Sequence, residues 1–206
     1  MKVMLVFGTR PEAIKMAPLC HLLKSQKEFN TLVCVTAQHR QMLDQALVAF
    51  ELCPDIDLDL MKDNQDLFDV TSSILLMMRD VLTEHKPDIV LVHGDTTTAF
   101  ATSLAAFYTG ICIGHVEAGL RTNDLRAPFP EEFNRKVAGL VTDLHFAPTD
   151  GSKSNLLEEG ISAKNIWVTG NTVIDSLHWI LRKLEEDHLF KKKVFTRIEN
   201  LLPFDW

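Results

Sequence analysis

The sequence predicts an α/β protein built on a doubly wound parallel sheet, a Rossmann-like arrangement. Short runs that are apolar at almost every position alternate along the chain with longer stretches of amphipathic, helical periodicity. Strands that are apolar on both faces belong in a parallel sheet that helices cover on both sides. Right-handed crossovers make such a sheet doubly wound, and its ligands bind beyond the carboxyl ends of the strands.

The elements follow one another in the order that this architecture requires. Strands are expected at residues 3–7, 31–37, 56–60, 88–93, 111–116, 144–146 and 166–168. Helices are expected at residues 11–26, 40–51, 66–85, 96–108, 131–140, 151–159 and 173–186. Gly8 permits a tight turn after the first strand, and Pro11 suits the first turn of the helix that follows.

Residues 1–182 are expected to form one Rossmann-like domain, and residues 183–206 differ from it in kind. Acidic residues at 185–187 precede a run of three lysines at 191–193, and apolar residues then recur at helical spacing. The chain ends on Pro203-Phe204-Asp205-Trp206. Two interpretations stay open: a helical linker at the start of a second domain that this chain lacks, or an amphipathic helix docked on the one domain present.

Composition narrows the class of protein. Hydrophobic residues make up 46% of the 206 positions, as in globular proteins, and the net charge of −7 argues against nucleic acid as a partner. The apolar run at the N-terminus is too short for a signal peptide or a membrane span. We therefore expect a soluble, cytoplasmic protein with no membrane partner. Three of the four cysteines lie in apolar runs and none forms a zinc-like pair, so buried free thiols are expected: Cys20, Cys34 and Cys112, with Cys53 apart.

Residues 8–15, Gly-Thr-Arg-Pro-Glu-Ala-Ile-Lys, are the first candidate for ligand binding. They follow a predicted strand, and the helix that they open offers free backbone amides to an anion. Arg10 and Lys15 add positive charge beside those amides, so a diphosphate or a sugar phosphate suits the position. The segment matches neither G-x-G-x-x-G nor a Walker motif. The alternative is a capped helix with two solvated cations.

Two similar segments, His93-Gly94-Asp95 and His115-Val116-Glu117, end the fourth and fifth predicted strands. Adjacent strand ends would bring two imidazoles and two carboxylates together, which suits either acid–base chemistry or a divalent metal ion. Gly94 interrupts the regularity that would place His93 and Asp95 on one face, which weakens the metal interpretation. Asp95 or a threonine after it could instead be a helix N-cap.

A loop with two prolines leads into the glutamates Glu131 and Glu132. Both suit the first turn of a helix, so a structural role is the default for one, while a rigid loop could deliver the other to the carboxyl edge of the sheet. Residues 169–175 have the pattern of a glycine turn with an Asn or Thr cap, and no chemistry is assigned to them. Trp167 and Trp179 are expected to belong to the core.

Six ordered segments together resemble one family, the non-hydrolysing UDP-N-acetylglucosamine 2-epimerases. They are GTRPEAIKMAP (8–18), TAQHR (36–40), VHGDTT (92–97), GHVEAGLR (114–121), PEE (130–132) and TGNTVID (169–175). The similarity runs from residue 1 to about residue 182. It implies the glycosyltransferase-B architecture, in which two Rossmann-like domains face a cleft. It also implies interconversion of UDP-N-acetylglucosamine and UDP-N-acetylmannosamine, with no redox cofactor and no essential metal.

The mechanism that this resemblance implies eliminates UDP across C1 and C2 of the sugar. The product is 2-acetamidoglucal, to which UDP is added back with the opposite configuration at C2. Proton removal needs a base, re-addition needs an acid on the other face, and the departing diphosphate needs cations. The resemblance makes Asp95, Glu117 and Glu131 the acid–base candidates and places Arg10 and Lys15 near the nucleotide. The secondary candidates in the same segments are His93, His115, Arg121 and Arg135. Phe129 stands where tryptophan is common, and its packing is expected to survive.

Family members are nearly twice as long, and their second domain supplies most of the uridine and diphosphate contacts. We therefore expect this chain to hold half an active site and not to turn over alone. The resemblance also implies a homodimer formed through the N-terminal domain. The alternatives are a hydrolysing relative that releases UDP and free N-acetylmannosamine, a non-catalytic module that binds sugar nucleotides, and a metal-dependent hydrolase.

Overall fold

The computed structural model describes residues 1–37, 40–62 and 64–201. Its centre is a seven-stranded sheet in the order β3-β2-β1-β4-β5-β6-β7, with every neighbouring pair parallel. The strands are β1 (Lys2–Phe7), β2 (Asn30–Val35), β3 (Ile56–Asp57), β4 (Ile89–His93), β5 (Cys112–Val116), β6 (Leu144–Ala147) and β7 (Ile166–Val168). The predicted α/β class and the doubly wound parallel sheet are confirmed.

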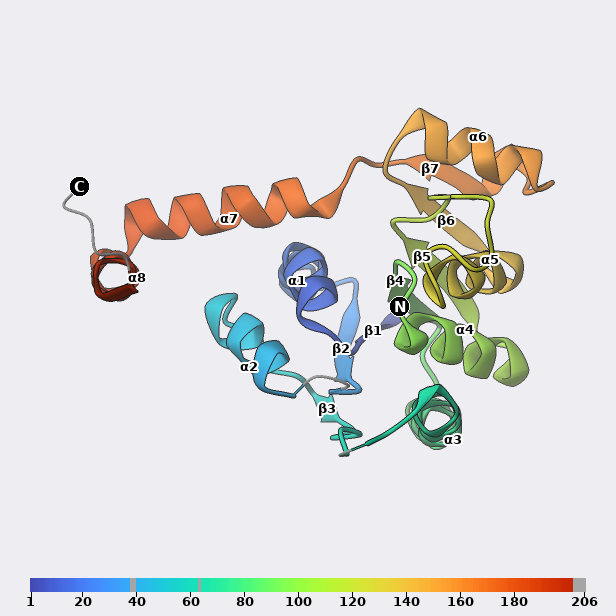
Figure 1. The fold of residues 1–206 in the computed structure, drawn as a ribbon, viewed down its shortest axis with the longest axis horizontal. Helices are drawn as coiled ribbons and strands as arrows, with labels where there is room; N and C mark the ends of the chain where they lie inside the picture. The colour runs from blue at the N-terminus through green and yellow to red at the C-terminus, as the bar shows by residue number, and fades with distance from the viewer. Residues whose placement is uncertain (38–39, 63, 202–206) are drawn as a thin grey trace.

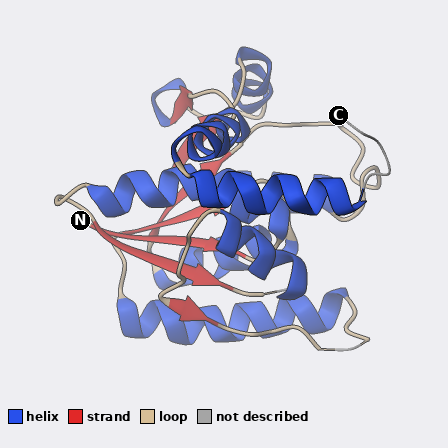
Figure 2. Cartoon of the chain, turned by 90° about the vertical axis from the view of Figure 1, so that its left-hand side faces the viewer, coloured by secondary structure: helices blue, strands red, loops and turns tan. Residues whose placement is uncertain are grey.

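Helices cover both faces of this sheet (Figures 1 and 2). The helices of the chain are α1 (Arg10–Ser25), α2 (Arg40–Ala49), α3 (Leu67–His85), α4 (Thr97–Thr109), α5 (Glu131–Val141), α6 (Asp150–Glu158), α7 (Thr172–Glu186) and α8 (His188–Leu201). The alternate residues of β1 show the two layers, because Leu5 joins the buried cluster of α1 and α2, whereas Met4 joins that of α3 and α4. Burial on both sides explains why the strands are apolar at successive positions.

The sheet has a switch point between β1 and β4. From β1 the chain winds outward through β2 to β3, returns to β4 on the other side of β1, and continues to β7. The loops after β1 and β4 therefore diverge to opposite faces at the carboxyl edge, which is where doubly wound sheets bind ligands.

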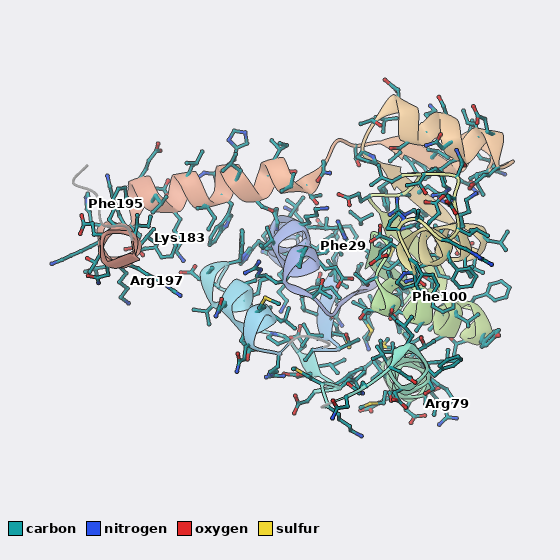
Figure 3. All side chains as sticks on the ribbon, viewed as in Figure 1. Phe29, Arg79, Phe100, Lys183, Phe195 and Arg197 are labelled. Carbon is teal, nitrogen blue, oxygen red and sulfur yellow. The ribbon has the colours of Figure 1, made fainter. Side chains whose placement is uncertain are left out.

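The C-terminal helices extend beyond the sheet. Helix α7 crosses α1, and Ser176 Oγ donates a hydrogen bond of 2.6 Å to the carbonyl of Ile14. Helix α8 lies at the far end of α7 (Figure 1). A groove of about 770 Å³ lies between α8 and α2. Lys183 of α7 points into this space and pairs with Glu51 (Figure 3). Helix α7 continues through residue 182, so the domain boundary there stays a prediction, and the expected tail at 203–206 lies outside the described residues.

Several expectations need correction. The third strand is confined to Ile56–Asp57, and Asp59, inside the expected strand, has a left-handed backbone with φ 45°. Trp167 is 44% exposed at the sheet edge, whereas Trp179 does pack on the core of α1 and α2. Phe129 is 66% exposed and lines an apolar surface groove, so the expected packing of this ring is wrong.

The expectation of buried thiols is met in part. Cys20 and Cys34 are buried and free, and burial raises the pKa of each to about 12. Cys112 is half-buried, and Cys53 is exposed. Within the described ranges no helix is long and apolar enough to cross a membrane, and the cytoplasmic location stays a prediction.

We predict that Gly119, two residues after Glu117, tolerates no side chain. Its φ is +90°, and a Cβ atom there would lie 2.3 Å from the carbonyl oxygen of Ser152. Gly160 is the matched control, because its φ is +85° and a Cβ would meet nothing within 4 Å. Gly160→Ala should lower the free energy of unfolding by about 1–2 kcal/mol through backbone strain alone. Gly119→Ala should lose roughly 1–3 kcal/mol more through the clash, as measured by urea denaturation. Equal losses would show that the contact with Ser152 is unimportant.

Candidate active site

The loop after β1 is held by a buried glutamate, Glu12. Its Oε2 accepts hydrogen bonds from the backbone N–H groups of Gly8, at 3.0 Å, and Thr9, at 2.8 Å. Its Oε1 accepts from Thr96 Oγ1 at 2.7 Å, so the same carboxyl joins the loop after β1 to the loop after β4. Burial raises the pKa of Glu12, and the three donors oppose that shift. One fully buried carboxyl group, that of Glu12, therefore joins the two loops at the switch point.

Lys15 and Glu117 form the central ion pair of the site. Lys15 Nζ lies 2.8 Å from Oε1 and 2.7 Å from Oε2 of Glu117. Asn171, at the start of α7, donates from Nδ2 to Glu117 Oε2 at 2.8 Å. The Glu117 side chain is only 10% exposed, so these partners replace most of the water that would otherwise solvate the carboxylate.

Glu117 has a strained backbone. Its φ is 63°, in the left-handed region that a residue with a side chain seldom adopts. It follows the last residue of β5, and its carboxylate contacts Lys15 of α1. Non-glycine residues in this region persist where the surroundings over-determine them, commonly at functional sites.

Asp95 lies beside a second cation. Arg135 of α5 contacts Asp95 Oδ2 at 2.5 Å, and Asn134 Nδ2 donates to the Asp95 carbonyl at 3.0 Å. Burial raises the pKa of Asp95, while Arg135 lowers it and the nearby Glu131 and Glu117 raise it. Thr96, not Asp95, is the N-cap of α4, because its hydroxyl accepts from Ala99 N at 3.0 Å. The Asp95 carboxylate is therefore not used for capping.

The two glutamates of α5 have different roles. Glu132 is fully buried, and its carboxylate accepts from the backbone N–H groups of Thr122 and Asn123 at 3.1 and 3.0 Å. Glu131, the first residue of α5, is half-buried and close enough to Asp95 to affect its pKa. Glu132 thus shapes the loop, and Glu131 remains available to a ligand.

His93 and His115 are both buried, but their imidazole rings have different contacts. His115 donates from Nε2 to the Gly94 carbonyl at 2.7 Å and so supports the turn that carries Asp95. His93 Nε2 lies 3.8 Å from Glu117 Oε2, and within the described ranges it has no hydrogen-bond partner. Burial lowers the pKa of His93 to about 4 and that of His115 to about 3, so both rings are neutral at pH 7.

The remaining predicted residues divide between the site and the scaffold. Arg10 is exposed in the first turn of α1, at the carboxyl edge of the sheet. Arg121 belongs to the scaffold, because its guanidinium forms a bidentate pair of 2.7 Å with Glu159 after α6. Across residues 1–37, 40–62 and 64–201, no three His, Cys, Asp or Glu side chains are grouped so that they could hold a metal ion.

Two residues that bear on the site escaped the sequence analysis, Glu12 and Asn171. Each has the appearance of a helix-start residue, and each does serve that purpose. Their further partners, Thr96 and Glu117, lie 84 and 54 residues away along the chain. The available signal was the placement of each at the carboxyl end of a strand, where a polar side chain can face the ligand crevice.

Comparison with known proteins shows the family of this chain. The family described as UDP-N-acetylglucosamine 2-epimerase matches residues 21–201. The chain belongs to the UDP-N-acetylglucosamine 2-epimerase family. The enzyme of that name from Campylobacter jejuni is 54% identical over 199 residues, which are 97% of this chain and 52% of the relative. The corresponding Escherichia coli protein is 58% identical over 87% of this chain and 48% of its own length.

Solved structures of the family share the fold. The UDP-GlcNAc 2-epimerase of Neisseria meningitidis, bound to UDP-GlcNAc, superposes with a TM-score of 0.92 at 52% identity, over 100% of this chain and 54% of that one. The enzyme of Methanocaldococcus jannaschii, in complex with UDP-GlcNAc and UDP, gives 0.85 at 34% identity, over 91% and 51%. The chain thus spans about half the length of these relatives, as the N-terminal, Rossmann-like half of a glycosyltransferase-B-type fold.

We predict that the neutral histidine beside Glu117 makes the fold sensitive to acid. Because the pKa of His93 is lowered on folding, the unfolded chain binds a proton between pH 6.5 and about 4 that the folded chain does not. The free energy of unfolding should therefore fall as pH is lowered through that window. His93→Leu should reduce this pH dependence in urea denaturation at pH 7 and pH 4.5. An undiminished dependence in the variant would show that His93 titrates alike in both states.

Proposed function

We propose that this chain supplies the N-terminal half of the active site of a non-hydrolysing UDP-N-acetylglucosamine 2-epimerase. The observation that carries the proposal is that Asp95, Glu117 and Glu131 lie near one another at the carboxyl edge of the sheet, each beside a cation or another carboxylate. Family membership supplies the substrate class, because relatives of the same fold are solved with UDP-GlcNAc and UDP. The reaction requires no added cofactor.

The arrangement suits the two proton transfers of elimination and re-addition. One group must take the C2 proton from one face of the sugar, and another must return a proton to the opposite face. Asp95 suits a proton carrier, because burial raises its pKa toward the working pH. Glu117, directly after the neighbouring strand, is held by an ion pair with Lys15 and by the amide of Asn171, which fix the orientation of its carboxylate for proton transfer. Glu131 completes the set of candidates.

The departing UDP needs positive charge at the other end of the bond that breaks. Helix α1 starts at the carboxyl edge of the sheet, and the positive end of its dipole favours an anion. Arg10 is exposed there. Lys15 follows five residues later on the same helix and is paired with Glu117. We propose that Arg10 meets the diphosphate, while Lys15 stabilises the charge that passes between Glu117 and the sugar.

We predict that turnover requires both halves of the cleft. The chain should be assayed with UDP-GlcNAc in D₂O, alone and with the C-terminal half of a relative. The combined halves should form UDP-N-acetylmannosamine with deuterium at C2, and the chain alone should not. Asp95→Asn, Glu117→Gln and Glu131→Gln should each lower kcat by roughly 10²–10⁴-fold. Glu158→Gln, on the exposed surface of α6, is the matched control and should retain activity.

The other outcomes distinguish the alternative functions. Free N-acetylmannosamine plus UDP would support the hydrolysing reaction, and activity lost to a chelator would support metal-dependent hydrolysis. Calorimetric binding of UDP-GlcNAc with no turnover by the combined halves would support a binding module. The epimerase proposal fails if those halves produce no UDP-N-acetylmannosamine.

We also propose that the chain forms a homodimer through this domain. Exposed apolar side chains lie on α3, α4 and α5, and several of them line a groove of about 590 Å³ between those helices. Phe68 of α3 is 84% exposed, and Leu140 of α5 is 78% exposed. A group of exposed apolar side chains around such a groove marks an interaction site on a folded protein.

We predict that the chain sediments at twice the mass of one copy. Phe68→Glu should shift it to the mass of one copy by placing a charge in the apolar surface. Val48→Glu is the matched control, because Val48 is 77% exposed on α2, across the sheet from α3. Sedimentation velocity at a fixed concentration measures the difference. A single-copy mass for the unchanged chain would overturn the dimer.

A further inference from the structure

The carboxylate of Glu117 receives its hydrogen bonds from two helices. Lys15 comes from α1 and spans both oxygens, and Asn171 comes from the start of α7 and donates to Oε2 at 2.8 Å. With 10% of the side chain exposed, water has little part in orienting this group. Its direction therefore depends on where α1 and α7 lie.

The amide of Asn171 can point only one way. Its Oδ1 accepts from Val173 N at 3.0 Å as the N-cap of α7, so Nδ2 is left to face Glu117. Aspartate or serine would cap the helix about as well as asparagine. Ionised aspartate has no proton to donate, and the serine side chain is shorter than the amide. Capping alone does not require an amide here, whereas the contact with Glu117 does.

Docking of α7 on α1 brings both donors to the same carboxylate. The hydrogen bond from Ser176 Oγ to the Ile14 carbonyl lies one residue before Lys15 and about one turn after Asn171. Further along α7, Trp179 stacks on His21 of α1, with ring centroids 5.6 Å apart and planes 7° apart. These contacts fix the position of α7 relative to Lys15.

We propose that Asn171 is a positioning residue for Glu117, and that the docking of α7 on α1 sets the direction in which this carboxylate meets the sugar. The effect on turnover rests on the proposed function, but the contact itself does not. Asn171 acts through Glu117 and touches no reacting atom in this scheme.

The first experiment uses the chain without substrate. The side-chain amide signals of Asn171, identified in ¹⁵N-labelled protein by their loss in Asn171→Asp, should shift in Glu117→Ala. They should stay in place in Glu131→Ala, the matched control. Ser176→Ala should move them in the same direction by a smaller amount. Side-chain amide signals of Asn171 that do not shift in Glu117→Ala would overturn the positioning contact.

The second experiment measures turnover by the combined halves. Asn171→Asp keeps the cap but sets a carboxylate against Glu117, so kcat should fall about 10²-fold, with a smaller change in KM. The acid limb of the pH–rate profile should move to higher pH, because the added negative charge opposes the loss of a proton from neighbouring carboxylates. Asn171→Ser keeps the cap without that charge and should lose less activity, with no such movement.

Asn200→Asp on α8 is the matched control, since it adds the same charge far from the site. Asn171→Ser keeps the cap and should unfold close to the urea concentration of the parent, so a loss of activity in it is not a loss of helix capping. Asn171→Asp should unfold at a lower urea concentration, because two carboxylates then face each other. Parental kcat and an unmoved acid limb in Asn171→Asp would falsify the proposal. If the parent halves are inactive while the amide signals still respond to Glu117→Ala, the epimerase function fails and the contact stands.

Discussion

The ion pair between Lys15 and Glu117 is the interaction on which the geometry of this site depends. It joins the first helix to the end of the fifth strand, two segments separated by 102 residues. Taking these charges out of water is costly unless each is fully partnered. The strained backbone of Glu117, the amide of Asn171 and the docking of α7 are all arrangements that provide such partnering.

A similar principle applies to the other buried polar groups around the crevice. Glu12 and Glu132 each receive two backbone N–H groups, and each thereby fixes a loop that would otherwise be free at the carboxyl edge. His115 fixes a third loop through the Gly94 carbonyl. The scaffold thus uses its buried polar side chains to hold loops, while the groups open to a ligand come from residues next to them. Glu131 beside Glu132 is the clearest example.

Most of the fold could be predicted from sequence because the strands are apolar on both faces and their helices follow at regular intervals. The short β3 could not, since Asp57 and Asp59 interrupt an otherwise suitable run and only pairing with β2 defines its length. Asp95 and Glu117 could be singled out because strand ends converge at one edge, and the family resemblance made them, together with Glu131, the acid–base candidates. The role of Glu12 was not, because it depends on a hydroxyl from the loop after β4. Arg121 shares a segment with Glu117, yet its partner Glu159 belongs to the region after α6, which no local pattern reveals.

Helix α7 also has a mechanical property. Its 15 residues span about 22 Å, and Ser176, one of its points of attachment to α1, lies about 7 Å from Asn171 and 15 Å from the last residue of the helix. A tilt about that fastening would move the two ends in opposite directions, with half the displacement at the end nearer to it. A 2 Å movement of the last turn would correspond to about 1 Å at the amide, which is enough to break a hydrogen bond of 2.8 Å. The helix is in effect a lever whose short arm ends on Glu117.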